Sequence, residues 1–256
     1  MLLCVDIGNT NITLGIFDRD NLLETLRLAS DRELTQEEYE VLLHNLLKKY
    51  DINNCIIASV AQELDKVIKR SIDNIFHINS IIMNNKLNYG ISVNIKNPNE
   101  AGADRIVNAL AACKLYSNPA IIVDLGTATT FDIINKQGEF IGGVIMPGLN
   151  LQLKSLNAYT SKLPRVEVGK SNSAIGNCTT RAILSGVIRG SACAIEGLIK
   201  QCEAELGGKA TIIATGGYST LISDYMNKKF DFVNPYLTLE GLKYLFELNC
   251  QSIQEK

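Results

Sequence analysis

The sequence lacks several features that would fix a class of protein on their own. No CxxC pair occurs among the seven cysteines, and there are only two histidines, His44 and His77, which stand apart. Seven cysteines, an odd number, without a CxxC pair argue against a disulfide framework or a zinc site. We therefore expect buried thiols in a reducing compartment. The sequence also shows no Ser/His/Asp or Cys/His grouping of the kind that nucleophilic catalysis uses.

Long apolar runs and an excess of basic charge are missing as well. The net charge is −2 and the basic residues are scattered, so no general attraction for nucleic acid or acidic membranes is expected. No apolar stretch approaches the roughly 20 residues needed to cross a bilayer. The segment Met1–Asp6 has no basic lead-in of the kind found in secretory signals. These absences predict a cytoplasmic protein with no nucleic-acid or membrane partner.

What is present is typical of a globular α/β protein. Of the 256 residues, 46% are hydrophobic and 20% are charged, enough for a sizeable core and for two domains. Apolar and alternating patterns predict strands at 2–5, 12–17, 21–29, 55–59, 75–78, 120–123, 130–134 and 210–214. Helices are predicted after the capping box Thr35–Glu38, at 62–71, at 98–116 and at 182–200.

A repeated motif is the most informative feature. Val5–Thr10 and Val123–Ala128 align their aspartates and glycines at an offset of 118 residues, the difference between positions 124 and 6. Each copy follows an apolar strand and precedes a strand of alternating pattern. Because the two copies are about one domain length apart, they predict a duplicated architecture. The predicted domains are residues 1–117 and 118–256.

Each copy of the motif has the chemistry of a phosphate site. A glycine in a tight hairpin lets backbone N–H groups face a common point, and an aspartate at the strand end can attract a hard cation. Further side-chain donors are available from Asn9, Thr10, Thr127, Thr129 and Thr130. We expect the two hairpins to clamp a metal-bound polyphosphate, although each could merely close a turn. No GxxxxGK[ST] loop is present.

A third glycine-rich turn follows the strand predicted at 210–214. Gly216 and Gly217 come directly after Thr215 and precede a helical pattern, so a purine or ribose could approach the backbone there. A glycine pair after a strand is also a common simple turn. Its position after two phosphate motifs is what favours an adenosine site.

The segment Gly102–Arg105 has the chemistry of an acceptor site. It lies near the start of the helix predicted at 98–116, where backbone donors and the helix dipole favour anions. Asp104 could accept the proton of an acceptor hydroxyl, and Arg105 could bind a carboxylate or phosphate through its planar fork. A structural explanation fits equally well: Asp104 would only stabilise the start of the helix through its dipole, and Arg105 would be an ordinary surface residue.

The order of these segments resembles the type III pantothenate kinases over essentially the whole chain. The resemblance rests on Asp6–Thr10, Asn97-Pro98 followed by Gly102–Arg105, Asp124–Thr129, Gly142-Gly143 with Pro147-Gly148, and Thr179 ahead of Ala182-Ile183 and Ser185-Gly186. It implies duplicated actin/hexokinase-like (ribonuclease H-like) α/β domains, with mixed sheets flanked by helices. It also implies ATP-dependent phosphorylation of pantothenate to 4′-phosphopantothenate, the first step of coenzyme A biosynthesis.

The resemblance further implies roles for individual residues. Asp104 would be the general base, Asp124 the ligand of a monovalent cation, K⁺ or NH₄⁺, and Asp6 a ligand of Mg²⁺. ATP would be held by Thr127 and by Asp6, Ile7, Gly8, Asn9, Thr10, Asn11, Ile12 and Thr13. Pantothenate would be held by Gly102, Ala103, Asp104, Arg105 and Thr179. The resemblance implies a homodimer with the substrate site near the subunit interface, and the small residues of 182–200 suit either a subunit contact or a buried helix.

One position departs from the family pattern. Many members carry a tyrosine three residues before the proline, where this chain has Ile95, and isoleucine cannot make the hydrogen bond of a phenol. Two other functions keep the phosphate hairpins: a sugar or polyol kinase of the same fold, and a non-catalytic nucleotide-dependent regulatory protein. An intact Asp104 favours catalysis, because a pure switch needs no base.

Overall fold

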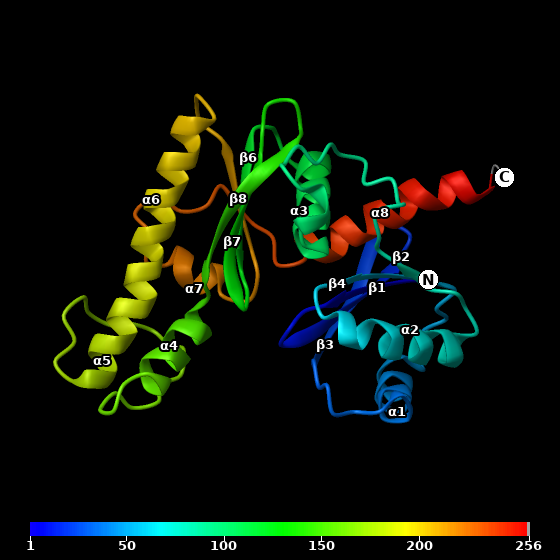
Figure 1. Cartoon of the computed structure of the whole chain (residues 1–256), viewed down its shortest axis with the longest axis horizontal. Helices are drawn as coiled ribbons and strands as arrows, with labels where there is room; N and C mark the ends of the chain where they lie inside the picture. The colour runs from blue at the N-terminus through cyan, green and yellow to red at the C-terminus, as the bar shows by residue number, and fades with distance from the viewer. Residues whose placement is uncertain (255–256) are drawn as a thin grey trace. The chain divides into compact units, whose positions relative to one another are not determined.

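The computed structural model describes residues 1–254 and divides them into two compact units. The first consists of 1–92, 96–111 and 237–254, and the second of 93–95 and 112–236. Each unit is built on one five-stranded sheet (Figure 1).

The sheet of the first unit has the strand order β3-β2-β1-β4-β5. Strands β1, β2 and β3 form an antiparallel meander, and β4 pairs in parallel with β1 on its other side. The elements are β1 (Leu2–Ile7), β2 (Asn11–Asp18), β3 (Asn21–Ala29), α1 (Gln36–Leu47), β4 (Asn54–Ser59), α2 (Gln62–Phe76), β5 (Ile81–Ile82), the 3₁₀ turn η1 (Pro98–Glu100), α3 (Ala103–Leu115) and α8 (Leu237–Gln254).

The second sheet repeats this topology. Its order, β10-β9-β6-β7-β8, is the first order with β6 in the place of β1 and β9 in the place of β4. β6 is antiparallel to β7 and parallel to β9, as β1 is to β2 and β4. The elements are β6 (Ala120–Leu125), β7 (Ala128–Ile134), β8 (Phe140–Pro147), α4 (Leu149–Ala158), α5 (Thr179–Leu184), the π-helical turn η2 (Ser185–Arg189), α6 (Gly190–Glu205), β9 (Thr211–Thr215), α7 (Ser219–Ser223) and β10 (Phe232–Val233). The predicted duplication is confirmed.

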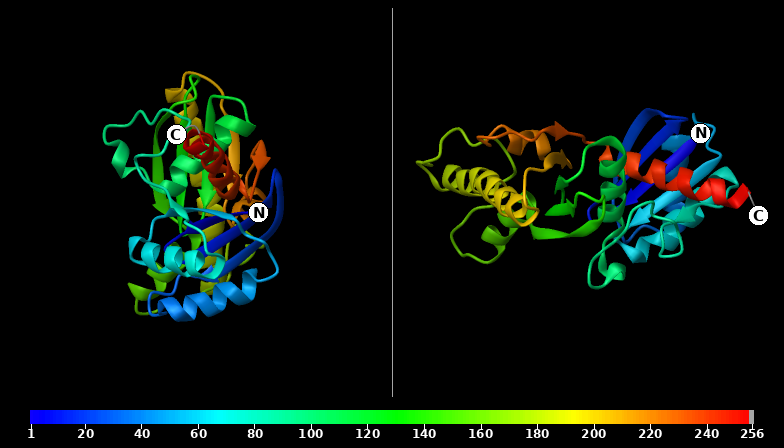
Figure 2. Two further views of the ribbon diagram at one scale, coloured as in Figure 1. Left: turned by 90° about the vertical axis from the view of Figure 1, so that its right-hand side faces the viewer. Right: turned by 90° about the horizontal axis from the view of Figure 1, so that it is seen from above.

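Helices cover both faces of the first sheet. Leu3, Val5 and Ile7 of β1 pack against α1 and α2, and Cys4, between them in sequence, packs with residues of α3 and α8 on the opposite face. This explains why β1 is apolar at successive positions, because both of its faces are buried. Both views of Figure 2 show α8 beside the β1–β3 meander.

The structural division differs from the predicted domains in three places. Residues 93–95 and 112–117 belong to the second unit, although the prediction placed them with the first. The C-terminal helix α8 belongs to the first unit, although the prediction placed 237–254 with the second. The physical reason is the uncovered face of the first sheet. Leu239, Leu242 and Leu245 fill it by packing with Phe17, Ile56 and Ala58.

Three local predictions are corrected. No strand occurs at 75–78, because α2 continues to Phe76 and the next short strand is β5 at Ile81–Ile82. The single helix predicted at 98–116 is interrupted: η1 ends at Glu100 and α3 begins at Ala103. The cysteines of the described residues are all free, as predicted, but only Cys4 and Cys55 are buried, whereas Cys178 and Cys193 are exposed.

Helices α5, η2 and α6 form one stretch, Thr179–Glu205, that is long and apolar enough to cross a membrane by length and composition alone. The prediction from the sequence had found no such stretch. Its apolar residues, including Ile183, Val187, Ile188, Ile195 and Ile199, belong to the core of the second unit. The stretch is therefore explained as a core helix that lies along the second sheet (Figure 1).

Candidate active site

The first predicted phosphate motif forms the hairpin between β1 and β2. Asp6 is the penultimate residue of β1 and faces Thr13 across the antiparallel pair. The Gly8 N–H donates to the Asn11 carbonyl oxygen at 3.0 Å and closes the turn, which leaves Asn9 and Thr10 exposed at the tip. The residues predicted to hold ATP, Asp6–Thr13, thus lie in one hairpin.

The acceptor segment, Gly102–Arg105, forms the start of α3. Asp104 lies in the first turn, where the helix dipole favours a carboxylate. One of its oxygens, Oδ1, accepts a hydrogen bond from the backbone N–H of Arg105 at 2.8 Å. Burial raises the pKa of Asp104, and the Arg105 N–H and guanidinium oppose that rise. A carboxylate with a raised pKa is a stronger proton acceptor, as a general base requires.

Gly102 makes room for this carboxylate. A Cβ atom at Gly102 would lie 2.5 Å from Asp104 Oδ1 and 3.6 Å from Val60 Cγ1. A separation of 2.5 Å is too short for a stable contact, so a larger residue at this position would have to displace the Asp104 carboxylate.

The acceptor segment is tied to the first hairpin through Val60, the residue after β4. The Val60 N–H donates to the Ile7 carbonyl oxygen at 3.0 Å, and the Val60 side chain lies beside Gly102, 3.6 Å from where an added Cβ atom would be. Because β1 and β4 run in parallel, their carboxyl ends share one edge of the sheet. The start of α3 is therefore held at the sheet edge that carries the hairpin, and the structure brings two predicted site segments of the first unit together.

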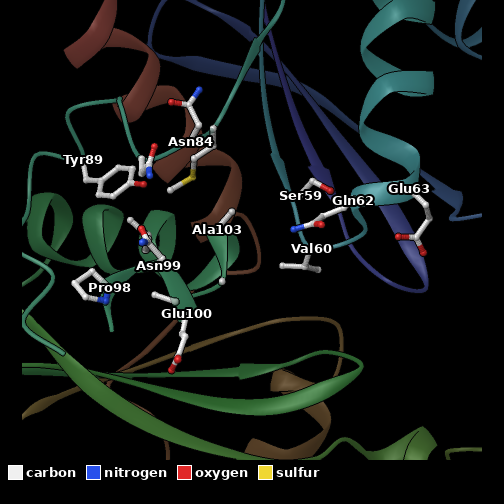
Figure 3. A pocket seen from close by; sticks show the side chains of 15 residues that line it. Ser59, Val60, Gln62, Glu63, Asn84, Tyr89, Pro98, Asn99, Glu100 and Ala103 are labelled. Carbon is white, nitrogen blue, oxygen red and sulfur yellow. The ribbon is translucent and has the colours of Figure 1, made fainter. Parts of the chain in front are cut away.

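A pocket of about 670 Å³ opens beside the acceptor segment, entirely within the first unit. Its size suits a small metabolite. Gly102 and Ala103 line it together with Ser59, Val60, Gln62, Glu63, Met83, Asn84, Asn85, Tyr89, Pro98, Asn99, Glu100, Ala101 and Ile106. In Figure 3, Tyr89, Asn99 and Ala103 face Ser59, Val60 and Gln62 across the opening.

The sequence reasoning missed Asn84, Asn85 and Tyr89. They lie in a polar segment without helical or strand periodicity, and only its position just ahead of Pro98 hinted at a role. Burial raises the pKa of the Tyr89 phenol, so it stays protonated and can donate a hydrogen bond in the pocket. Ile95 belongs to the second unit, where its side chain lies near Gly142.

The second phosphate motif forms the equivalent hairpin of the second unit. The Gly126 N–H donates to the Ala128 carbonyl oxygen at 3.0 Å and closes a turn, with Thr127 in it, that is one residue shorter than the turn from Gly8 to Asn11. Asp124 pairs in register with Thr215 of β9, so the third glycine-rich turn reaches the same place. A Cβ atom at Gly216, whose φ is +84°, would lie 2.5 Å from Asp124 Oδ1. Asp124, Thr127 and Gly216 therefore form one cluster.

Thr179 is not part of that cluster. It is exposed as the first residue of helix α5, which lies apart from the β6–β7 hairpin (Figure 1). The structure therefore places the predicted residues of the second unit in two locations.

A metal ion bound in the described part of the chain would need ligands besides protein side chains, such as water or substrate phosphates. No group of three or more His, Cys, Asp or Glu side chains that could hold a metal occurs among the described residues. Asp6 and Asp124 offer carboxylate oxygens, and Mg²⁺ typically binds one or two carboxylates together with water and substrate phosphates. The donor chemistry therefore fits hard cations bound jointly with a nucleotide.

Comparison with known families decides between the possible kinases. The family model described as type III pantothenate kinase matches residues 2–201. The chain belongs to the type III pantothenate kinase family. It is an ATP-dependent enzyme that phosphorylates pantothenate in coenzyme A biosynthesis, and kinases of this family use a divalent metal ion with ATP. The prediction from the sequence is confirmed in family, activity and fold.

Two curated type III pantothenate kinases illustrate how complete the match is. The protein from Moorella thermoacetica is 42% identical over 254 residues, which cover 97% of this chain and 100% of that protein. The protein from Bacillus cytotoxicus is 38% identical over 261 residues, covering 100% and 99%. The match thus includes both units.

Solved structures with the same fold have much lower sequence identity. The activator of 2-hydroxyisocaproyl-CoA dehydratase from Clostridium difficile, solved with bound ADPNP, has a TM-score of 0.57 at 13% identity and covers 100% of this chain and 97% of that chain. The polyphosphate/ATP-glucomannokinase from Arthrobacter has a TM-score of 0.51 at 14% identity, with 98% of both chains covered. These likenesses support the actin/hexokinase-like fold and nothing finer.

Proposed function

We propose that Asp104 is the general base that accepts the proton of the pantothenate hydroxyl as it attacks the γ-phosphate of ATP. The main support is the position of the Asp104 carboxylate at the start of α3, next to a pocket lined by Gly102 and Ala103. Burial raises the pKa of this carboxylate. Phosphoryl transfer depends mainly on positioning and charge stabilisation, and the acceptor must also lose its proton. A basic carboxylate beside the acceptor pocket meets that need.

The phosphate chain of ATP is assigned to the hairpin of Asp6, Ile7, Gly8, Asn9, Thr10, Asn11, Ile12 and Thr13, with Thr127 as a contact from the second hairpin. The support is that a glycine N–H closes each hairpin, by a bond from Gly8 to Asn11 in the first and from Gly126 to Ala128 in the second. The first of these carries exposed polar side chains at its tip. Hairpin N–H groups and short polar side chains suit phosphate oxygens.

Two cations are assigned to the two strand-end aspartates. Asp6 would hold Mg²⁺ together with phosphate oxygens and water, and Asp124 would hold K⁺ or NH₄⁺. The support for the second site is the close approach of the Gly216 backbone to Asp124, which leaves no space for a larger side chain. Bound cations would offset the negative charge of the transferred phosphoryl group.

Pantothenate is assigned to the pocket beside Gly102, Ala103, Asp104 and Arg105. Its carboxylate matches the guanidinium of Arg105, and its amide and hydroxyl groups match polar pocket residues such as Asn84 and Tyr89. Thr179 is exposed in the second unit, as a residue that contacts substrate across the interface of a homodimer would be before assembly. We place this homodimer in the cytoplasm.

The test is ADP release from the purified protein with ATP and Mg²⁺, with and without pantothenate, in potassium and then in sodium buffer. The proposal predicts turnover that requires pantothenate and is much faster in potassium. Equal rates in the two buffers would remove the role of Asp124. Turnover that is independent of pantothenate would remove the acceptor assignment.

A further inference from the structure

Arg32 joins the first hairpin to the acceptor pocket by two side-chain contacts. Its Nη2 donates to Asn9 Oδ1 at 3.3 Å, and its Nε donates to Glu63 Oε1 in an ion pair. Asn9 lies at the tip of the β1–β2 hairpin, and Glu63 lies in the first turn of α2, where it lines the pocket (Figure 3). All three residues belong to the first unit.

The backbone on the N-terminal side of Arg32 is fixed to the hairpin and to the core. Ser30 donates from Oγ to the Gly8 carbonyl oxygen at 2.6 Å and from its N–H to the Thr10 carbonyl oxygen at 3.0 Å. The hydroxyl of buried Tyr39 accepts from the Asp31 N–H at 3.0 Å and donates to the Asp31 carbonyl oxygen at 2.7 Å. Arg32 therefore extends from a fixed segment.

The contact with Arg32 determines which end of the Asn9 amide points to it. A guanidinium has only donors, so it can bind only the amide oxygen. The Nδ2 group of Asn9 is then directed away from Arg32 as a hydrogen-bond donor. If the amide were turned over, it would offer its oxygen to a phosphate, which is also an acceptor.

The geometry points to Arg32 as a positioning residue that holds the Asn9 amide as a donor to the nucleotide phosphates, with Glu63 holding Arg32. This inference rests on the proposed placement of the phosphates at the first hairpin. A purely stabilising ion pair explains the arrangement less well. The side chains of Arg32 and Glu63 are 45% and 51% exposed, and ion pairs that exposed contribute little to folding.

The experiment measures the affinity of the full-length protein for ADP with Mg²⁺ by isothermal titration calorimetry, together with Tm without ligand. The variants are Arg32→Gln, Asn9→Ala and the double variant. Arg70→Gln is the matched control, because Arg70 is an exposed arginine on α2 of the same unit. We expect Kd for ADP to rise about tenfold in Arg32→Gln, the size of one hydrogen bond to a charged group. Tm and the control should stay unchanged.

The double variant separates positioning from other roles. If Arg32 acts through Asn9, the double variant binds ADP no more weakly than Asn9→Ala alone. Additive losses would overturn the inference, because Arg32 would then act independently of Asn9, and so would an unchanged Kd in Arg32→Gln or a fall in Tm that accounts for the loss. An unchanged Kd in Asn9→Ala would instead overturn the placement of the phosphates at this hairpin.

Discussion

The N–H of Val60 donates a hydrogen bond to the carbonyl oxygen of Ile7 at 3.0 Å, and this bond holds Val60, whose side chain lies beside Gly102, at the end of β1. Gly102 in turn leaves space for the Asp104 carboxylate. The acceptor segment and the first hairpin are thus positioned by the same strand pair, β1 and β4. Substitutions at this junction should lower catalytic activity more than they lower the stability of the fold.

Replacing Gly102 by alanine tests this junction. The added Cβ would lie 2.5 Å from Asp104 Oδ1 and must displace the carboxylate. We expect kcat to fall by about two orders of magnitude, the usual contribution of a positioned base, while KM for ATP changes little. Steady-state kinetics measure both. A variant with normal kcat would show that the position of Asp104 is not critical. Gly208→Ala is a matched control, because a Cβ there meets no atom within 4 Å.

The raised pKa of Asp104 predicts the pH dependence of turnover. A general base must be deprotonated, so activity should be lost as the pH falls through the pKa of Asp104. Because burial raises that pKa, the acidic limb of the kcat/KM profile should lie at a higher pH than an ordinary aspartate would give. A pH–rate profile measures the limb. An acidic limb at the usual aspartate value would contradict burial of the catalytic base.

The same shift has a consequence for stability. A carboxyl whose pKa is higher in the folded than in the unfolded state binds its proton more tightly when folded, so its charged form destabilises the fold at neutral pH. Asp104→Asn removes that charge and keeps an oxygen that can accept from the Arg105 N–H. Thermal unfolding at neutral pH should therefore show an unchanged or higher Tm. A clear loss of stability would show that the charge is compensated in the folded protein.

Tyr89 offers a test of the acceptor pocket. Tyr89→Phe removes only the hydroxyl, and loss of one hydrogen bond should raise KM for pantothenate by about tenfold without changing KM for ATP. Tyr50→Phe is a control, because Tyr50 hydrogen-bonds to Glu24 and does not line this pocket. Equal kinetics for Tyr89→Phe and the wild type would exclude the phenol from substrate binding.

The strands and hairpins around Asp6 and Asp124 could be predicted from the sequence, because they depend on local patterns. The apolar runs before Asp6 and Asp124 and the glycines after them specify strand and turn within ten residues. Packing between distant parts of the chain could not be predicted in this way. The return of α8 to the first sheet depends on which face α1 and α2 leave uncovered, and the link from Asn9 through Arg32 to Glu63 joins segments more than 20 residues apart.

The pocket shows the same limit in the candidate site. Asp104 and Arg105 stood out because an acid and an arginine at a helix start have recognisable chemistry. Tyr89 carries no such local signal, since it lies in an irregular segment, next to Gly90, whose φ is +69°. Hydrogen bonds between Asn88 and Asn249 of α8 fix that segment. The contact could not be predicted from the sequence, because Asn88 and Asn249 are 161 residues apart.

The most direct test of the central claim is the turnover of Asp104→Asn with saturating pantothenate, ATP, Mg²⁺ and K⁺, measured beside its affinity for ATP. The account predicts a kcat lower by at least about 100-fold with ATP affinity unchanged, because the base is lost and the phosphate hairpin is intact. A fully active variant would contradict the role of Asp104 as the base.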